Sequence, residues 1–151
     1  MARVDANATT EPLTDELLQQ LLASATPEAY LSSVELPDRT LPAYLHELLK
    51  KKRLKRSEVI RTSGLNGTHA YQVFTGERNI GRDNAIMLAF GLQCTLQETQ
   101  RLLRLAGVSE LWCKVRRDAI IIYCMEHGMT RVACDDELWR LKEKTLLPLE
   151  G

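Results

Sequence analysis

Residues 54–78 read LKRSEVIRTSGLNGTHAYQVFTGER, and this stretch decides how the chain is expected to fold. Its apolar and polar residues are spaced for two short helices, over about residues 55–63 and 66–74. Gly64 lies between them, where a sharp turn needs a residue that tolerates a positive φ angle. Gly76 stands at the position that follows a helix C-terminus. The stretch therefore predicts two helices joined by a tight turn.

The same stretch resembles the helix-turn-helix of the Cro and phage-repressor family of DNA-binding proteins, and the resemblance extends over about residues 41–105. Glu58 stands at the acidic position of the family's first helix, and Gly64 stands at its turn glycine. Val73 stands at the apolar position that packs the family's second helix on the core. The resemblance implies an all-α fold with a five-helix repressor-like domain. Its recognition helix, residues 66–74, would lie in the DNA major groove.

For function, the resemblance implies a sequence-specific transcriptional regulator, bacterial or from a phage, that binds double-stranded DNA as a homodimer. Gln72 can pair bidentately with adenine, and Thr68 can place its methyl group against thymine. Any small-molecule effector is left open. The base contacts are assigned to Thr68, His69 and Gln72. The phosphate contacts are assigned to Lys55, Arg56, Asn66, Tyr71 and Arg78.

Three features depart from the family. The family has alanine where this chain has Ile60 and a larger apolar residue where it has Ala70, so the two are expected to exchange volume across one contact. Ser63 replaces an apolar residue, whose packing Leu65 is expected to take over. Arg56 replaces a glutamine that contacts phosphate, and an arginine can make a stronger, charge-assisted contact there.

Gly67 leaves the start of the recognition helix without a side chain, where the family commonly carries a base-reading residue. Two interpretations stay open: specificity that comes from DNA shape, or a helix that no longer reads DNA. In the second, the chain is a helical protein-interaction adaptor that keeps the fold, and residues such as Thr68 form an ordinary polar surface. Salt-dependent binding to duplex DNA would separate the two functions.

The net charge of zero conceals an uneven distribution along the chain. Residues 1–38 carry a net charge of −6, residues 39–104 a net charge of +7 and residues 105–151 a net charge of −1. A basic middle segment favours a surface that faces phosphate. The cations of residues 50–56 could equally be a solvated helix end, because cations at a helix C-terminus interact favourably with the helix dipole.

The sequence divides into three parts: an acidic helical arm and linker (1–39), the helix-turn-helix domain (40–107) and a C-terminal helical hairpin (108–151). The last two helices are expected to end near Gly128 and Lys144. Apolar spacing and capping signals predict helices that start near Thr14, Thr26, Thr40, Asp83, Thr95, Arg116 and Thr130, besides the two of the helix-turn-helix.

Several residues recur at a spacing of 35 positions in the second half of the chain. This recurrence indicates either a duplicated helical hairpin or chance, since the intervening residues do not match. The recurring pairs are Arg82 and Arg117, Asp83 and Asp118, Thr95 and Thr130, Ile86 and Ile121, and Leu103 and Leu138.

Other kinds of site find little support in the sequence. Cys113, Cys124, His127 and Cys134 could form a zinc set, but their spacing matches no usual zinc motif, and buried cysteines are the alternative. No nucleophile triad, phosphate-binding glycine loop or carboxylate pair stands out, so neither catalysis nor a metal or other cofactor is predicted. No apolar run approaches the roughly 18 residues of a membrane helix, and no secretory signal begins the chain. A cytoplasmic protein with reduced thiols is expected.

Overall fold

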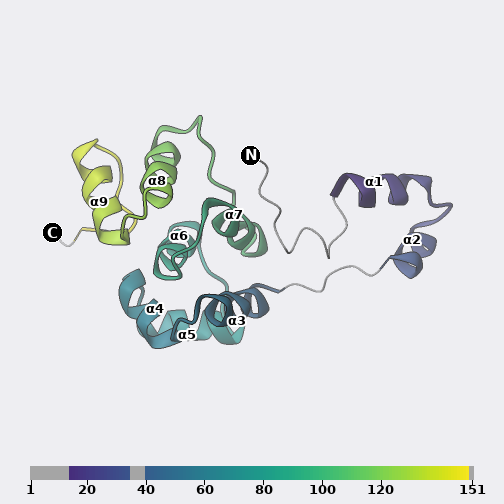
Figure 1. The fold of residues 1–151 in the computed structure, drawn as a ribbon, viewed down its shortest axis with the longest axis horizontal. Helices are drawn as coiled ribbons and strands as arrows, with labels where there is room; N and C mark the ends of the chain where they lie inside the picture. Colours follow the sequence, from purple (N-terminus) through teal and green to yellow (C-terminus); the bar gives the residue numbers. More distant parts are fainter. Residues whose placement is uncertain (1–13, 35–39, 150–151) are drawn as a thin grey trace. The chain divides into compact units, whose positions relative to one another are not determined.

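The computed structural model describes residues 14–34 and 40–149, and within these ranges the chain is helical, with connecting turns and without a strand (Figure 1). The all-α fold class is thereby confirmed. The chain falls into two compact units, Met1–Asp38 and Arg39–Gly151, which are described separately.

The first unit contains the helices α1 (Thr14–Ala23) and α2 (Pro27–Ser33). Thr26 caps α2 as predicted, because its hydroxyl oxygen accepts a hydrogen bond from the backbone N–H of Ala29 at 3.1 Å. Of the side chains described in this unit, only Tyr30 is buried. The linker predicted over residues 34–38 lies, apart from Val34, outside the described residues.

Seven helices make up the described part of the second unit, and their positions agree with the predictions except at the last helix. That helix ends at Arg140 rather than near Lys144, because Lys142 adopts a left-handed conformation with φ 65°. The helices are α3 (Leu41–Lys52), α4 (Arg56–Ser63), α5 (Gly67–Thr75), α6 (Arg82–Gly91), α7 (Leu96–Leu105), α8 (Arg116–Glu126) and α9 (Arg131–Arg140).

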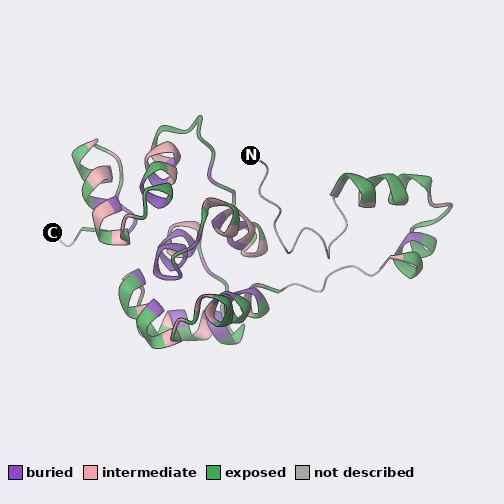
Figure 2. Ribbon diagram, in the orientation of Figure 1, coloured by how far each residue is buried: buried purple, intermediate pink, exposed green. Residues whose placement is uncertain are grey.

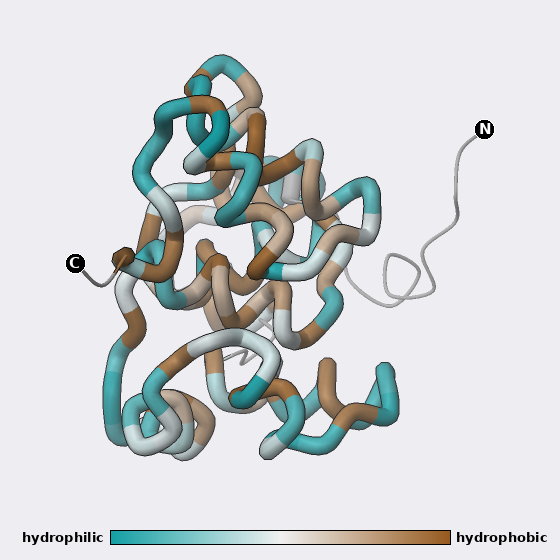
Figure 3. The backbone as a smooth tube through the Cα atoms, turned by 90° about the vertical axis from the view of Figure 1, so that its left-hand side faces the viewer, coloured by the Kyte–Doolittle hydropathy of each residue, from teal (hydrophilic) through white to brown (hydrophobic). Residues whose placement is uncertain are grey.

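One hydrophobic core joins these seven helices. Leu48 of α3, Phe74 of α5, Ile86 of α6, Ile121 of α8 and Leu138 of α9 all belong to it. The residues assigned to a separate hairpin, 108–151, therefore share a core with residues 40–107. Helix α6 is buried along most of its length, whereas α8 and α9 each expose one side (Figure 2). Short hydrophobic and hydrophilic stretches follow one another along the helices (Figure 3), as is typical of amphipathic helices.

The turn between α4 and α5 is built around Gly64, whose φ is 84°. Ser63 stabilises the turn: its buried hydroxyl donates to the carbonyl oxygen of Ile60 at 2.7 Å and accepts from the N–H of Leu65 at 3.2 Å. Ser63 thus satisfies the backbone polar groups of the turn instead of supplying apolar packing. Arg131 of α9 covers the other side of the turn, 2.9 Å from the place where a Cβ atom on Gly64 would lie.

Gly91 fixes the approach of α4 to α6. A Cβ atom on Gly91 would lie 2.6 Å from the carbonyl oxygen of Val59 and 3.0 Å from the Cβ of Ser63. Only glycine fits at such a close approach. The sequence analysis assigned Gly91 to the end of a helix, and its second role in interhelical packing becomes visible only when α4 is in place.

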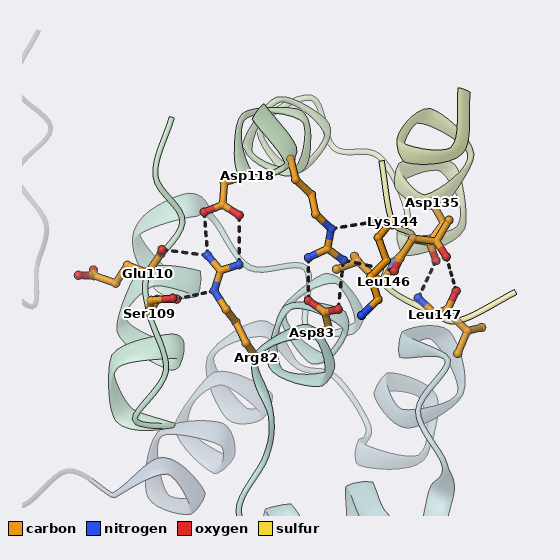
Figure 4. Close-up of polar contacts among 11 residues, drawn as sticks. Arg82, Asp83, Ser109, Glu110, Asp118, Asp135, Lys144, Leu146 and Leu147 are labelled. Atoms are coloured by element: carbon orange, nitrogen blue, oxygen red, sulfur yellow. Dashed lines mark hydrogen bonds and ion pairs between the residues drawn. The ribbon is translucent and has the colours of Figure 1, made fainter. Parts of the chain in front are cut away.

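The hairpins α6–α7 and α8–α9 are each held by an arginine at the start of their first helix (Figure 4). In the first hairpin, Arg82 donates from Nε to the carbonyl oxygen of Ser109 at 2.9 Å and from Nη2 to that of Glu110 at 3.0 Å. The same guanidinium pairs bidentately with Asp118 of α8, at 3.1 and 2.7 Å. Arg82 therefore connects the start of α6, the segment after α7 and the other hairpin.

The two backbone contacts recur 35 residues later, and the ion pair recurs with the roles of the two hairpins exchanged. Arg117 donates from Nε to the carbonyl oxygen of Lys144 at 2.8 Å and from Nη2 to that of Thr145 at 3.2 Å. It also pairs bidentately with Asp83 of α6, at 2.9 and 3.1 Å. Each hairpin thus supplies the arginine of one ion pair and the aspartate of the other. Two units related by a two-fold axis exchange contacts in this way.

Further correspondences run through the two hairpins. The bounds of α7 and α9 differ by 35 residues at both ends. The side chain of Gln100 binds the backbone of Leu111, and at the corresponding positions a carboxylate oxygen of Asp135 accepts from the N–H of Leu146. Of the two interpretations of the recurring residues, the structure supports a duplicated helical hairpin.

Candidate nucleic-acid interface

Helix α5 begins where the sequence predicts it to. Asn66 is its N-cap, and the side-chain oxygen Oδ1 accepts a hydrogen bond from the N–H of His69 at 3.1 Å. Ala70, Val73 and Phe74 are buried on the side that faces the core. Because helical side chains repeat every 3.6 residues, this burial fixes which side of α5 faces outward.

Three of the predicted contact residues lie on the outward side of α5. Thr68 and Tyr71 are exposed, with Tyr71 48% accessible, and Gln72 is half-buried beside them. Thr75, which the sequence analysis did not assign to the site, is exposed on the same side. Its spacing of one helical turn from Tyr71 and two from Thr68 would have been the signal for it.

His69 is placed differently from the other predicted base-contacting residues. Like Gln72 it is half-buried, but its ring nitrogen Nε2 is inaccessible to solvent and has no hydrogen-bond partner in the described part of the chain. A base edge approaching the outward side of α5 would therefore meet Thr68 and Gln72 before it meets His69.

A hollow of about 510 Å³ lies between the first turns of α4 and α5. The Arg56 guanidinium carbon lies 4.5 Å from the centre of the Tyr71 ring, a cation–π contact that brings together two predicted phosphate-contacting residues. The lining of the hollow also includes Ser57, Ile60 and Gly67. The first turns of two helices carry partial positive charge from unpaired N–H groups, so this hollow suits an anion.

Ser57 was not identified from the sequence as a site residue. It belongs to the first turn of α4, and its position directly after Arg56 was the available signal. Gly67 contributes by leaving the hollow open, since nothing lies within 4 Å of the place where its Cβ would be. Ile60 is half-buried at this hollow and Ala70 is fully buried. Their direct contact stays a prediction.

The basic residues at the end of α3 divide into two groups. Lys51 and Lys52 pair with Glu98 of α7, with Nζ–carboxylate distances of 3.2 and 2.8 Å. These two lysines therefore bind α3 to α7. Lys50, Arg53, Lys55 and, beyond α5, Arg78 are exposed cations of the same part of the chain.

The titration of Glu98 reflects this pairing. Burial raises the pKa of Glu98. Hydrogen bonds from the Lys52 ammonium, the Thr95 N–H and the Lys51 ammonium lower this pKa by more than burial raises it. The net pKa is below the usual 4.5. Glu98 also completes the predicted capping box, in which Thr95 and Glu98 each accept from the other's backbone N–H.

The possible zinc ligands do not form a site. Cys124 and Cys134 are buried and Cys113 is exposed. Within residues 14–34 and 40–149, no three His, Cys, Asp or Glu side chains come together in a metal-binding arrangement. The pKa of Cys94, a thiol outside that set, is raised to about 12 by burial, which makes it unreactive as a nucleophile. None of the described helices has the length and apolar character needed to cross a bilayer.

Comparisons with known protein families, with curated proteins and with solved structures find no match to this chain. The surface formed by α4 and α5 is thus the basis on which a function can be inferred. Its main features are an outward polar side on α5 and a hollow at two helix starts, lined by Arg56 and Tyr71.

Proposed function

We propose that the chain is a sequence-specific DNA-binding transcriptional regulator. In this proposal, residues 40–107 form a five-helix repressor-like domain with α5 as the recognition helix in the major groove. Thr68 and Gln72 contact base edges, and Lys55, Arg56, Asn66, Tyr71 and Arg78 contact phosphates. The protein, of bacterial or phage origin, acts in the cytoplasm as a homodimer on palindromic sites.

The observation that carries the proposal is the hollow between the first turns of α4 and α5. A phosphate there would lie beside the Arg56 guanidinium and the N-terminal turns of two helices. The outward side of α5 beside this hollow presents the polar groups of Thr68, Tyr71 and Gln72. A backbone-binding hollow directly beside a polar helix side is what positioning and readout of a duplex require.

The Asn66 side chain also fits a phosphate contact. Its oxygen is used in capping α5, so its amide N–H₂ group is left to donate. Tyr71 is 48% exposed, and its hydroxyl can donate to a phosphate while Arg56 lies against its ring. Arg56 and Tyr71 therefore support each other as backbone contacts.

A second function, a helical protein-interaction adaptor, remains in competition. It is favoured by Gly67, which offers no side chain for readout, and by the half-buried position of His69. Two of the cations expected near the site, Lys51 and Lys52, are also paired with Glu98. An adaptor would bind no duplex in a salt-dependent way.

The deciding experiment is selection of bound duplexes from a random pool by the full chain, followed by titration of an enriched duplex and a scrambled one. DNA binding should weaken at least about tenfold between 50 and 200 mM salt, through counterion release. Failure to enrich any sequence, together with salt-independent or absent binding, would favour the adaptor.

Two substitutions then separate readout from positioning. Gln72→Ala should cost about 1–3 kcal/mol on the enriched duplex and relax the preference at one base pair. Arg56→Ala should weaken both duplexes about equally and reduce the salt slope by about one. Arg104→Ala is the matched control: it also removes one positive charge, from an exposed position at the end of α7. If Gln72→Ala affected both duplexes by the same factor, α5 would not read bases.

A further inference from the structure

A groove of about 340 Å³ lies between the two helices of the second hairpin. Helix α8 contributes Ile120 and Tyr123, and α9 contributes Glu137 and Arg140. Tyr123 is 58% exposed, and its ring stacks on His127 at a centroid distance of 3.8 Å. The groove therefore has a half-buried apolar floor, an exposed aromatic ring and two charged groups along one side.

The corresponding part of the first hairpin is covered. Ala85, Leu88 and Leu102 stand 35 positions before Ile120, Tyr123 and Glu137, and each is fully buried. In the first hairpin, α4 packs on α6 and α3 packs on α7. Within residues 40–149, the groove of the second hairpin is lined by α8, α9 and Leu141, the residue after α9. One copy of the duplicated hairpin thus has helices on this face, and the other presents it to solvent.

The groove carries one acidic and one basic side chain, so its charges can be complementary to those of the same groove in a second copy. Glu137 and Arg140 lie one turn apart on α9, with Oε2 and Nε 2.6 Å from each other. An interface between two identical copies uses the same patch twice, so an acid and a base on that patch can exchange partners across the axis. The two hairpins already pair in this way inside one chain, through Arg82 with Asp118 and Arg117 with Asp83.

We propose that this groove is a dimer interface, occupied by the same groove of a second copy of the chain. The α9 helices lie antiparallel, so that Arg140 of each copy faces Glu137 of the other, and Tyr123 covers the apolar floor. Because like charges would meet if either charge were reversed, the pairing also fixes the register of the two copies. The interface supplies the homodimer of the proposed function, but it does not rest on DNA binding.

Sedimentation velocity of the full chain over a range of concentrations tests the proposal. The chain should dimerise, and Glu137→Arg or Arg140→Glu alone should weaken dimerisation at least about tenfold, because each places two like charges in the interface. A mixture of these two variants should restore the dimer as a heterodimer. The double variant, with both charges reversed, should dimerise like the unmodified chain.

Arg104→Glu is the control, since Arg104 forms an exposed ion pair with Glu110 outside the groove and its reversal should leave dimerisation unchanged. Circular dichroism establishes that each variant is folded. A chain that stays monomeric at all concentrations, or a dimer unaffected by both single reversals, overturns the proposal. If dimerisation responds to the charge reversals as expected but the chain binds no duplex, the proposed DNA function is wrong and the proposed interface is supported.

Discussion

The hairpins α6–α7 and α8–α9 have the same backbone plan and opposite surroundings. Both begin with an arginine that binds the carbonyl groups of the segment after the hairpin, and both place a threonine at the start of their second helix. The first hairpin is covered by α3 and α4, whereas the second keeps an open groove. The contacts that hold the two helices of a hairpin together are therefore independent of the outer surface of the hairpin, which determines whether other helices pack on it.

The largest expected effect comes from the two arginine–aspartate pairs. Arg82→Ala should cost about 3–5 kcal/mol, because it removes the charged partner of the Asp118 carboxylate, which is only 5% exposed and keeps the Trp112 N–H as a donor. Arg117→Ala should cost less, because Asp83 is 27% exposed and water can solvate it. Urea unfolding of both variants measures the difference. Equal losses would mean that burial of the aspartate does not set the cost.

A smaller effect is expected where the first hairpin meets α4. Gly91→Ala should cost about 1–3 kcal/mol, since its methyl group would lie 2.6 Å from the carbonyl oxygen of Val59 and α4 must shift. Gly81→Ala is the matched control, because nothing lies within 4 Å of its added Cβ. The control should change the free energy of unfolding by about 0.5 kcal/mol or less. Similar values for both variants would contradict the close packing of α4 on α6.

A smaller difference in stability is expected between the two hairpins when the threonine N-caps of their second helices, Thr95 and Thr130, are removed. Thr95→Ala and Thr130→Ala should each cost about 1 kcal/mol, the usual value for a lost N-cap. Thr95 should cost more, because Glu98 completes its capping box, whereas Ala133 holds the corresponding position after Thr130. Thermal unfolding followed by circular dichroism gives the order. A larger loss at Thr130 would show that the capping box adds nothing here.

The smallest expected effect is a pH dependence tied to Glu98. Its pKa is lowered in the folded chain, so its ion pairs stabilise the fold fully above its usual pKa of 4.5, and that stability is lost as pH falls through the folded pKa. The unmodified chain should exceed Glu98→Gln in stability by about 0.5 kcal/mol at pH 7. Denaturant unfolding at pH 7 and at pH 3 should show this difference shrinking. A constant difference would contradict the lowered pKa.

Local signals in the sequence were sufficient for most helices. Gly64 marked the turn, Thr26 and Pro27 marked the start of α2, and Thr95 with Glu98 marked the start of α7. Each of these acts through its own backbone neighbours, so the spacing of a few residues contains the information. The end of α9 was missed because Lys142, unlike glycine, gives no sequence indication of a left-handed conformation.

Contacts between distant segments could not be predicted in the same way. The recurrence of Arg82 and Asp83 was visible, but the exchange of partners between the hairpins depends on how they pack. The candidate site was predicted only in part from the sequence. Arg56 and Tyr71 were each assigned as phosphate contacts, but their cation–π contact depends on the angle between α4 and α5. The pairing of Lys51 and Lys52 with Glu98 likewise depends on α7 lying beside α3.

Because Arg131 lies against Gly64, the effect of a mutation at Gly64 depends on which residue stands at position 131. Asparagine accepts a positive φ better than most residues, so backbone conformation alone would allow Gly64→Asn. Its Cβ, however, would lie 2.9 Å from the guanidinium of Arg131. Gly64→Asn should therefore be tolerated better beside Arg131→Ala than beside arginine. The turn of the helix-turn-helix and the first residue of α9 are thus expected to show epistasis, although they lie in different parts of the sequence.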